Sequence, residues 1–269
     1  MEEAPKAESN QKKLLDVLTG HIQSLLHDDE RRRRTGERIN RVLFKDFFED
    51  EPSLAPQEEY SAKEEVTFRV IQSYFDLAQM VFSVEHCQYY FRRYPFRGLP
   101  VSRTDHLRNC CETYFDRIIQ FRDRLKCSLN LCKNESVIDG AEVSRILKIF
   151  DRVFAWEHKQ RNQTHHHARF DYFDLNQLSL AEMVGSQLPS EVRGIINPDR
   201  LFRNAARQWV SRIQSRTEGL TKLTEYVAGL FLECPSTKDL QTNDRKAGDS
   251  INNSEAALPK KADVGSSPA

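Results

Sequence analysis

Apolar residues recur at three- and four-residue intervals along most of this chain, which is the spacing of one face of an α-helix. The first apolar stripe, from Leu14 to Leu26, predicts an amphipathic helix of modest length. The stripes that predict the longer helices span residues 66–91, 107–132, 143–154 and 201–231. Shorter helices are expected over 39–47 and 178–188. The periodicity therefore predicts a protein built from helices alone.

Capping residues lie between these stripes. Ser61-Ala62-Lys63-Glu64 has the spacing of a capping box, and Ser102 and Asp139 precede the next two stripes as N-cap residues. Asn197-Pro198 has the preferred arrangement of N-cap and first helical residue. Each predicted long helix thus has a local signal for its start.

The ends of the predicted helices follow from the same pattern. Pro95, Gly98 and Pro100 are expected to end the stripe that begins at Val66. The stripe after Asp139 predicts one apolar helix that ends near Trp156. An irregular segment is expected after it, in which four apolar residues pack, namely Phe170, Tyr172, Phe173 and Leu175.

The fold class that these elements predict is all-α, an antiparallel helical bundle with extra short helices and disordered termini. Gly and Pro number only 10 each, which suits long uninterrupted helices. We expect a disordered N-terminus over 1–10, a single domain over 11–234 with its core at 62–234, and a disordered polar tail over 235–269.

The charge balance limits the partners that the chain can attract. Lys and Arg number 40, as do Asp and Glu, so no general affinity for nucleic acid is expected and any basic surface must be local. The run Arg31–Arg34 follows Asp28-Asp29-Glu30 and is typical of a solvated helix face. The six cysteines form no C-x-x-C pair, which predicts reduced core thiols. No long apolar run is present, so no membrane association is expected and a cytoplasmic location is predicted.

The chemically densest stretch is Lys159-Gln160-Arg161-Asn162-Gln163-Thr164-His165-His166-His167-Ala168-Arg169. An arginine can hold a phosphate with its planar fork of donors, and a histidine can transfer a proton near neutral pH. Such a pair can cleave RNA without a metal, because the ribose 2′-hydroxyl is an internal nucleophile. Arg161 and one of the histidines are therefore the candidate catalytic groups.

Two other interpretations of this stretch stay open. His158, the three histidines, Asp171 and Asp174 offer ligands for zinc, but adjacent histidines diverge along a helix, so we predict no metal and no cofactor. In a purely structural interpretation, Arg161 pairs with a carboxylate such as Glu157 and the histidines form a solvated helix end.

The motif Arg161-Asn162 followed by four residues and His167 resembles the signature of the HEPN superfamily, helical domains of many defence and toxin ribonucleases. The resemblance covers about 62–234. It implies that Arg161 and His167 are catalytic, that Asn162 supports them, and that two subunits bring their motifs together in one cleft. His166 also falls within the permitted spacing. The Arg-x4-His-x-Tyr variant is absent, because Ala168-Arg169 follows His167.

The sequence therefore predicts a metal-independent endoribonuclease of HEPN type that acts in a defence or toxin–antitoxin setting. RNA is the expected substrate, a homodimer the expected assembly, and an antitoxin or other regulatory protein a further expected partner. The expected RNA contacts are Arg169, Lys159, Arg92 and Arg93.

The alternative is a non-catalytic helical module that binds RNA or a protein partner. The residues that would carry this function are the Arg31–Arg34 run with Arg92, Arg93, Arg97, Arg203 and Arg207. The cluster Tyr89-Tyr90-Phe91-Arg92-Arg93-Tyr94 combines aromatic rings with arginines, as surfaces that stack nucleobases do. A packed helix end is the favoured role of this cluster.

Overall fold

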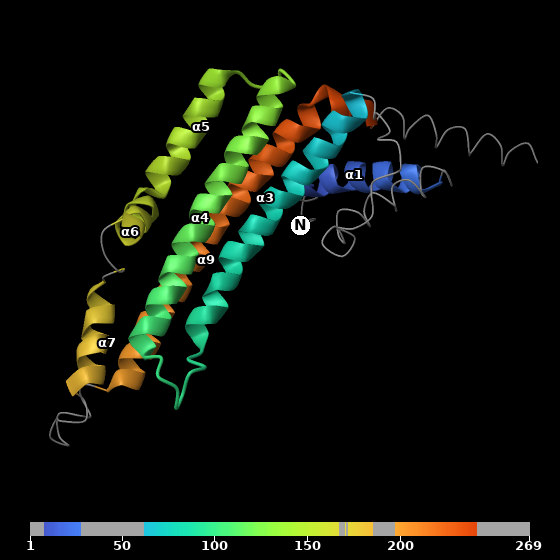
Figure 1. Cartoon of the computed structure of the whole chain (residues 1–269). Helices are drawn as coiled ribbons and strands as arrows, with labels where there is room; N and C mark the ends of the chain where they lie inside the picture. Colours follow the sequence, from blue (N-terminus) through green and yellow to red (C-terminus); the bar gives the residue numbers. More distant parts are fainter. Residues whose placement is uncertain (1–7, 28–61, 167–169, 171, 185–196, 241–269) are drawn as a thin grey trace, which may run out of the picture.

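The computed structural model describes residues 8–27, 62–166, 170, 172–184 and 197–240. The predicted fold class is confirmed, because every regular element in these ranges is a helix and none is a strand (Figure 1). The expected features at 31–34, 39–47 and Ser61 lie outside the described residues. The helices are α1 (Asn10–His27), α3 (Ala62–Arg92), α4 (Arg103–Asn134), α5 (Gly140–Val153), α6 (Ala155–His166), α7 (Phe173–Val184) and α9 (Pro198–Glu233).

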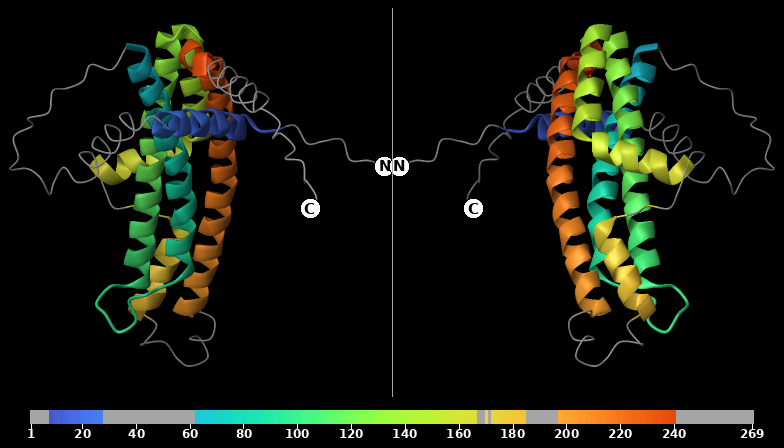
Figure 2. Two further views of the ribbon diagram at one scale, coloured as in Figure 1. Left: turned by 90° about the vertical axis from the view of Figure 1, so that its right-hand side faces the viewer. Right: turned by 90° about the vertical axis from the view of Figure 1, so that its left-hand side faces the viewer.

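Three long helices form the body of the molecule. The helix α3 packs on both α4 and α9 and runs antiparallel to them (Figures 1 and 2). The helix α1 lies across α9, and α5, α6 and α7 pack on α4. The end of the bundle where α3 finishes is also where α4 and α9 begin, so residues distant in sequence meet there.

Three helices, α4, α5 and α9, start at the cap residues predicted from the sequence. The Ser102 hydroxyl accepts a hydrogen bond from the backbone N–H of Asp105 at 2.9 Å, and the Asp139 carboxylate accepts one from Glu142 at 2.7 Å. Asn197 accepts from the backbone of Asp199 at 2.9 Å, with Pro198 as the first helical residue. These caps satisfy backbone donors that a helix leaves unpaired.

An aromatic cluster around Trp209 lies at the centre of the bundle. The Trp209 side chain is 3% exposed, and its ring stacks on Phe91 with ring centroids 5.6 Å apart. The rings of Tyr114, Phe115 and Trp156 lie within about 6 Å of it. One continuous core extends from Leu14 in α1 to Cys234. The predicted domain limits of 11–234 are compatible with this core and stay a prediction.

The predicted continuous helix from Asp139 to Trp156 is wrong. The chain leaves helical geometry at Phe154, with φ −103° and ψ 20°, so that α5 and α6 are separate helices that run in different directions. Val153, expected in the core, is 47% exposed. The apolar pattern hides this break, because Phe154 and Trp156 both face the core on either side of it.

Three further predictions need correction. The short helix expected at 178–188 is α7, which begins at Phe173 and is described to Val184. Phe173 is 70% exposed, so it does not pack as expected. The tail expected to be disordered from 235 is helical over 235–240, where Ser236, Thr237 and Leu240 are buried against the bundle.

All six cysteines are free thiols, as predicted, and five of them are buried. Burial raises the pKa of Cys87 to about 11 and that of Cys110 to about 12, so both stay protonated and unreactive at neutral pH. The exception is Cys127, which is exposed. Within the described ranges, no helix combines the length and apolar character that crossing a bilayer requires.

Candidate functional site

The helix α6 carries Arg161 and is held against α9 by a buried carboxylate. Glu157 is fully buried and accepts hydrogen bonds from Arg212 Nη2 at 2.9 Å, Arg216 Nε at 3.0 Å and the Tyr114 hydroxyl at 3.3 Å. The Arg212 guanidinium also lies 3.6 Å from the centroid of the Trp156 ring. Burial of Tyr114, next to the Glu157 carboxylate, raises the pKa of its hydroxyl.

Arg161 does pair with a carboxylate, as the structural interpretation predicts, but the partner is not Glu157, because Glu157 faces α9. Arg161 lies one turn later on α6 and faces α4, where its Nε is 3.5 Å from an Asp116 carboxylate oxygen. This Nε is buried and has no hydrogen-bond partner among the described residues. About a third of the Arg161 side chain is exposed, and Asn162 beside it is exposed. The two residues thus reach the surface at the edge of the α4–α6 contact.

The histidines beside Arg161 are only partly described. His166 is the last residue of α6, but its side chain and the whole of His167 and Arg169 lie outside the described residues, as does Asp171. Lys159 is exposed on α6. Among the residues that the structure describes, no group of three potential ligands could hold a metal ion. The predicted Arg161–His167 geometry therefore stays a prediction.

His158 belongs to a structural cluster on the same helix. Its Nε2 is 3.6 Å from an Asp151 oxygen, and that carboxylate is held by Arg122 through bonds of 2.6 and 2.9 Å. Burial lowers the pKa of His158, so its ring is uncharged at neutral pH. The hydrogen bond from Arg122 lowers the pKa of Asp151. These contacts fix α6 against α4 and α5.

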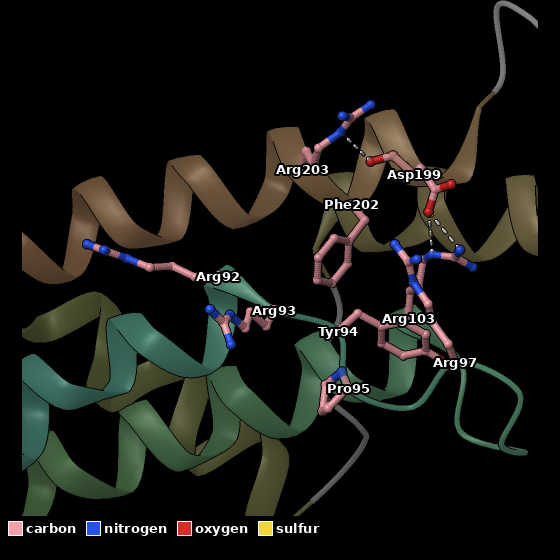
Figure 3. Close-up of a pocket in the computed structure, with 9 residues that line it drawn as sticks. All are labelled: Arg92, Arg93, Tyr94, Pro95, Arg97, Arg103, Asp199, Phe202 and Arg203. Atoms are coloured by element: carbon pink, nitrogen blue, oxygen red, sulfur yellow. Dashed lines mark hydrogen bonds and ion pairs between the residues drawn. The ribbon is translucent and has the colours of Figure 1, made fainter.

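Arg92 and Arg93 lie in a pocket at the end of the bundle where α3 finishes (Figure 3). They come from α3 and the residue after it, whereas Asp199, Phe202 and Arg203 come from α9. The cavity measures about 580 Å³. We call it the arginine pocket, and its lining consists of Arg92, Arg93, Tyr94, Pro95, Arg97, Arg103, Asp199, Phe202 and Arg203.

The arginine pocket has more positive than negative charge. Of its arginines, only Arg103 has a carboxylate partner within the described ranges. Its Nη2 is 2.7 Å from Asp199, and its Nη1 is 3.6 Å from Glu182. The Glu182 carboxylate also accepts from the backbone N–H groups of Arg103 and Thr104, at 2.9 and 3.3 Å, so it occupies the N-terminus of α4. Arg92 Nη2 donates to the Gln88 side chain at 2.8 Å, and Arg203 Nε donates to the backbone carbonyl of Asp199 at 3.2 Å. The donors that remain on Arg92 and Arg203, with those of Arg93 and Arg97, can contact a bound anion.

Aromatic residues build the wall of the arginine pocket. The rings of Tyr94 and Phe202 meet edge to face with centroids 6.0 Å apart, and the Arg103 guanidinium lies 5.2 Å from the Tyr94 ring. The Tyr94 hydroxyl donates to the carbonyl of Val101. His106 Nε2 lies 2.9 and 3.0 Å from the carbonyl oxygens of Tyr90 and Arg93, so this nitrogen carries the proton that it donates to them. The loop that bears Arg93 is thereby fixed.

The arginine pocket and the Arg161 region are separate places on the molecule. Arg103 and Asp116 lie thirteen residues apart on α4, which corresponds to about 20 Å along the helix. The predicted RNA contacts thus fall into two groups, with Lys159 on α6 and Arg92 and Arg93 at the bundle end. Arg103 follows the N-cap residue Ser102 and has no sequence signal that marks it as a binding residue, whereas Arg97 and Arg203 were predicted candidates for binding.

Comparison of the chain with protein-family models, with curated proteins and with solved structures finds no match. Nothing in these comparisons indicates a HEPN domain. The resemblance therefore depends on the Arg161-Asn162 motif and its position on a helix of the bundle.

Proposed function

We propose that this protein binds RNA through the arginine pocket. The observation that carries the proposal is that five arginines line one cavity of a chain whose formal net charge is zero, namely Arg92, Arg93, Arg97, Arg103 and Arg203. Such a concentration of one charge on a neutral protein creates a local field that attracts polyanions. It makes the arginine pocket the main candidate for phosphate binding.

The chemistry of the arginine pocket suits a nucleotide chain better than a simple carboxylate ligand. Guanidinium groups bind phosphate oxygens in a bidentate manner, and four of them have no carboxylate partner among the described residues. A cavity of about 580 Å³ is large enough for a nucleotide. The Tyr94 ring adds an aromatic surface at its wall, which a carboxylate peptide does not require.

The change that tests this proposal is the triple variant Arg93→Gln/Arg97→Gln/Arg203→Gln. We expect its affinity for a short single-stranded RNA to fall roughly thirty- to hundred-fold, because about three phosphate contacts are removed. The slope of log K against log salt should decrease in magnitude by about 2. Fluorescence anisotropy at several salt concentrations measures both quantities.

The matched control is Arg124→Gln/Lys148→Gln/Arg152→Gln, which removes the same charge from exposed positions on α4 and α5. This control should retain nearly the full affinity and salt slope. If the two triple variants lose RNA affinity equally, the effect comes from the overall charge of the protein, and the arginine pocket is not the binding site. An unmodified protein that does not bind RNA at low salt would remove the proposal.

Metal-independent RNA cleavage of HEPN type is the second candidate function. It is favoured by the position of Arg161, whose guanidinium is oriented by Asp116 while about a third of the side chain is exposed next to Asn162. An arginine held in this way can contact a substrate phosphate, and a histidine from the run at 165–167 would transfer the proton. The composite cleft of this mechanism requires a homodimer. An antitoxin or other regulatory protein would act on that cleft.

Cleavage of total RNA and tRNA in excess chelator tests this second function. We expect 2′,3′-cyclic phosphate ends, with a rate that falls about a hundred-fold or more in Arg161→Ala and in His167→Ala. His166→Ala is measured in parallel, because either histidine fits the motif. The absence of cleavage while RNA binding persists would exclude the enzyme and leave the binding function. A strict monomer in light scattering would exclude the composite cleft.

A further inference from the structure

The outer face of α3 exposes aromatic rings at regular intervals. Phe75, Phe82 and Tyr89 are 45%, 58% and 55% exposed and lie seven residues apart. Seven residues make nearly two helical turns, so these rings share one face at intervals of about 10 Å. Core residues of α3 such as Leu77 and Val84 lie on the opposite face of this helix. The exposed rings therefore contribute little to the core.

The part of this face nearest the arginine pocket is a continuous row of planar groups. The His86 ring centroid is 6.5 Å from that of Phe82 and 6.0 Å from that of Tyr89. The Arg92 guanidinium then lies 5.1 Å from the Tyr89 ring, and Arg92 also lines the arginine pocket. We call Phe82, His86, Tyr89 and Arg92 the stacking row. It connects the exposed aromatic face directly to the phosphate-binding candidate.

We infer that the stacking row binds the unpaired bases of a single-stranded RNA whose backbone lies in the arginine pocket. This inference rests on the proposed function and narrows its ligand to single strands. Aromatic side chains beside a positively charged groove are the usual means of binding single-stranded nucleic acid, because every base has a face that can stack. Bases inside a duplex cannot reach these rings, whereas phosphates of any polyanion can reach the arginines.

The chemistry of this face favours RNA over a second protein chain. Between the rings, the same face carries polar residues, namely Gln72, Gln79 and His86. A helix that pairs with another helix through seven-residue repeats requires apolar residues at both positions of each repeat. Amide and imidazole groups can instead donate to and accept from base edges. The stacking row also meets the arginine pocket at Arg92, so positive charge that can bind phosphate lies beside the exposed rings.

The variant that tests the inference is Phe82→Ala/Tyr89→Ala, with Phe173→Ala on α7 as a control for the loss of an exposed aromatic ring. Three probes of equal length are compared by fluorescence anisotropy: a single-stranded RNA, a duplex RNA and an abasic phosphodiester strand. We expect the double variant to lose roughly ten- to hundred-fold affinity for the single strand alone. Its salt slope and thermal melting should be unchanged, and Phe173→Ala should bind like the unmodified protein.

The outcomes separate this inference from the proposed function. If the arginine triple variant weakens all three probes while Phe82→Ala/Tyr89→Ala weakens none, the arginine pocket binds phosphate and the stacking row is excluded. If the double variant weakens the duplex and abasic strands equally, stacking is not its role. If the double variant has a lower molecular mass than the unmodified protein in light scattering but the same RNA affinity, this face mediates self-association and the inference is overturned. Absence of binding to any probe would remove both proposals.

Discussion

Glu157→Ala is expected to lower the free energy of unfolding by about 3–5 kcal/mol. The Glu157 carboxylate is fully buried and accepts hydrogen bonds from Arg212, Arg216 and Tyr114. Its removal leaves two guanidinium groups, each about 30% exposed, without their shared partner. The loss therefore comes mainly from uncompensated charge rather than from lost packing. Chemical denaturation followed by far-UV circular dichroism measures it.

The control for Glu157→Ala is Glu218→Ala, which removes an exposed carboxylate from α9 and should change stability by less than about 0.5 kcal/mol. Glu157→Gln should fall between the two, because the amide oxygen still accepts hydrogen bonds but carries no charge. A decrease in the free energy of unfolding of less than about 1 kcal/mol in Glu157→Ala would show that water solvates the Arg212 and Arg216 guanidinium groups adequately when the carboxylate is absent. The contact between α6 and α9 would then have another origin.

Trp209→Ala should lower the free energy of unfolding by about 3–5 kcal/mol, the range for loss of a large buried aromatic residue. The Trp209 ring stacks on Phe91 and contacts rings from α4, α6 and the segment before α7, so a single cavity would loosen several elements. Circular dichroism is the suitable measurement, because the chain has only 2 tryptophans and this change removes one fluorophore.

Trp209→Phe provides the matched comparison, since it keeps an aromatic ring against Phe91 and should cost less than Trp209→Ala. Loss of the stacking contact between Trp209 and Phe91 should also affect RNA binding, because Phe91 immediately precedes Arg92 and Arg93 in the chain. We therefore expect Trp209→Ala to weaken RNA binding as well. Equal stability of the two variants would contradict a central role for the Trp209 cluster.

The sequence alone determined the local features of this protein. Ser102, Asp139 and Asn197 cap their helices as predicted, because an N-cap bond joins residues two or three apart and depends on nothing else. The all-α class followed from apolar periodicity, which records the single buried face of each helix. Burial of five of the six cysteines followed from their places in those stripes.

The tertiary structure alone decided which charged groups meet. Glu157 binds Arg212 and Arg216, more than fifty residues away, instead of its neighbour Arg161, because the break at Phe154 turns α6 so that Glu157 faces α9. The arginine pocket joins Arg93 to Arg203 across the end of the bundle because α3 packs against α9. Helical periodicity specifies which face of a helix is buried but not which helix covers it, so a site built from several helices depends on how they pack.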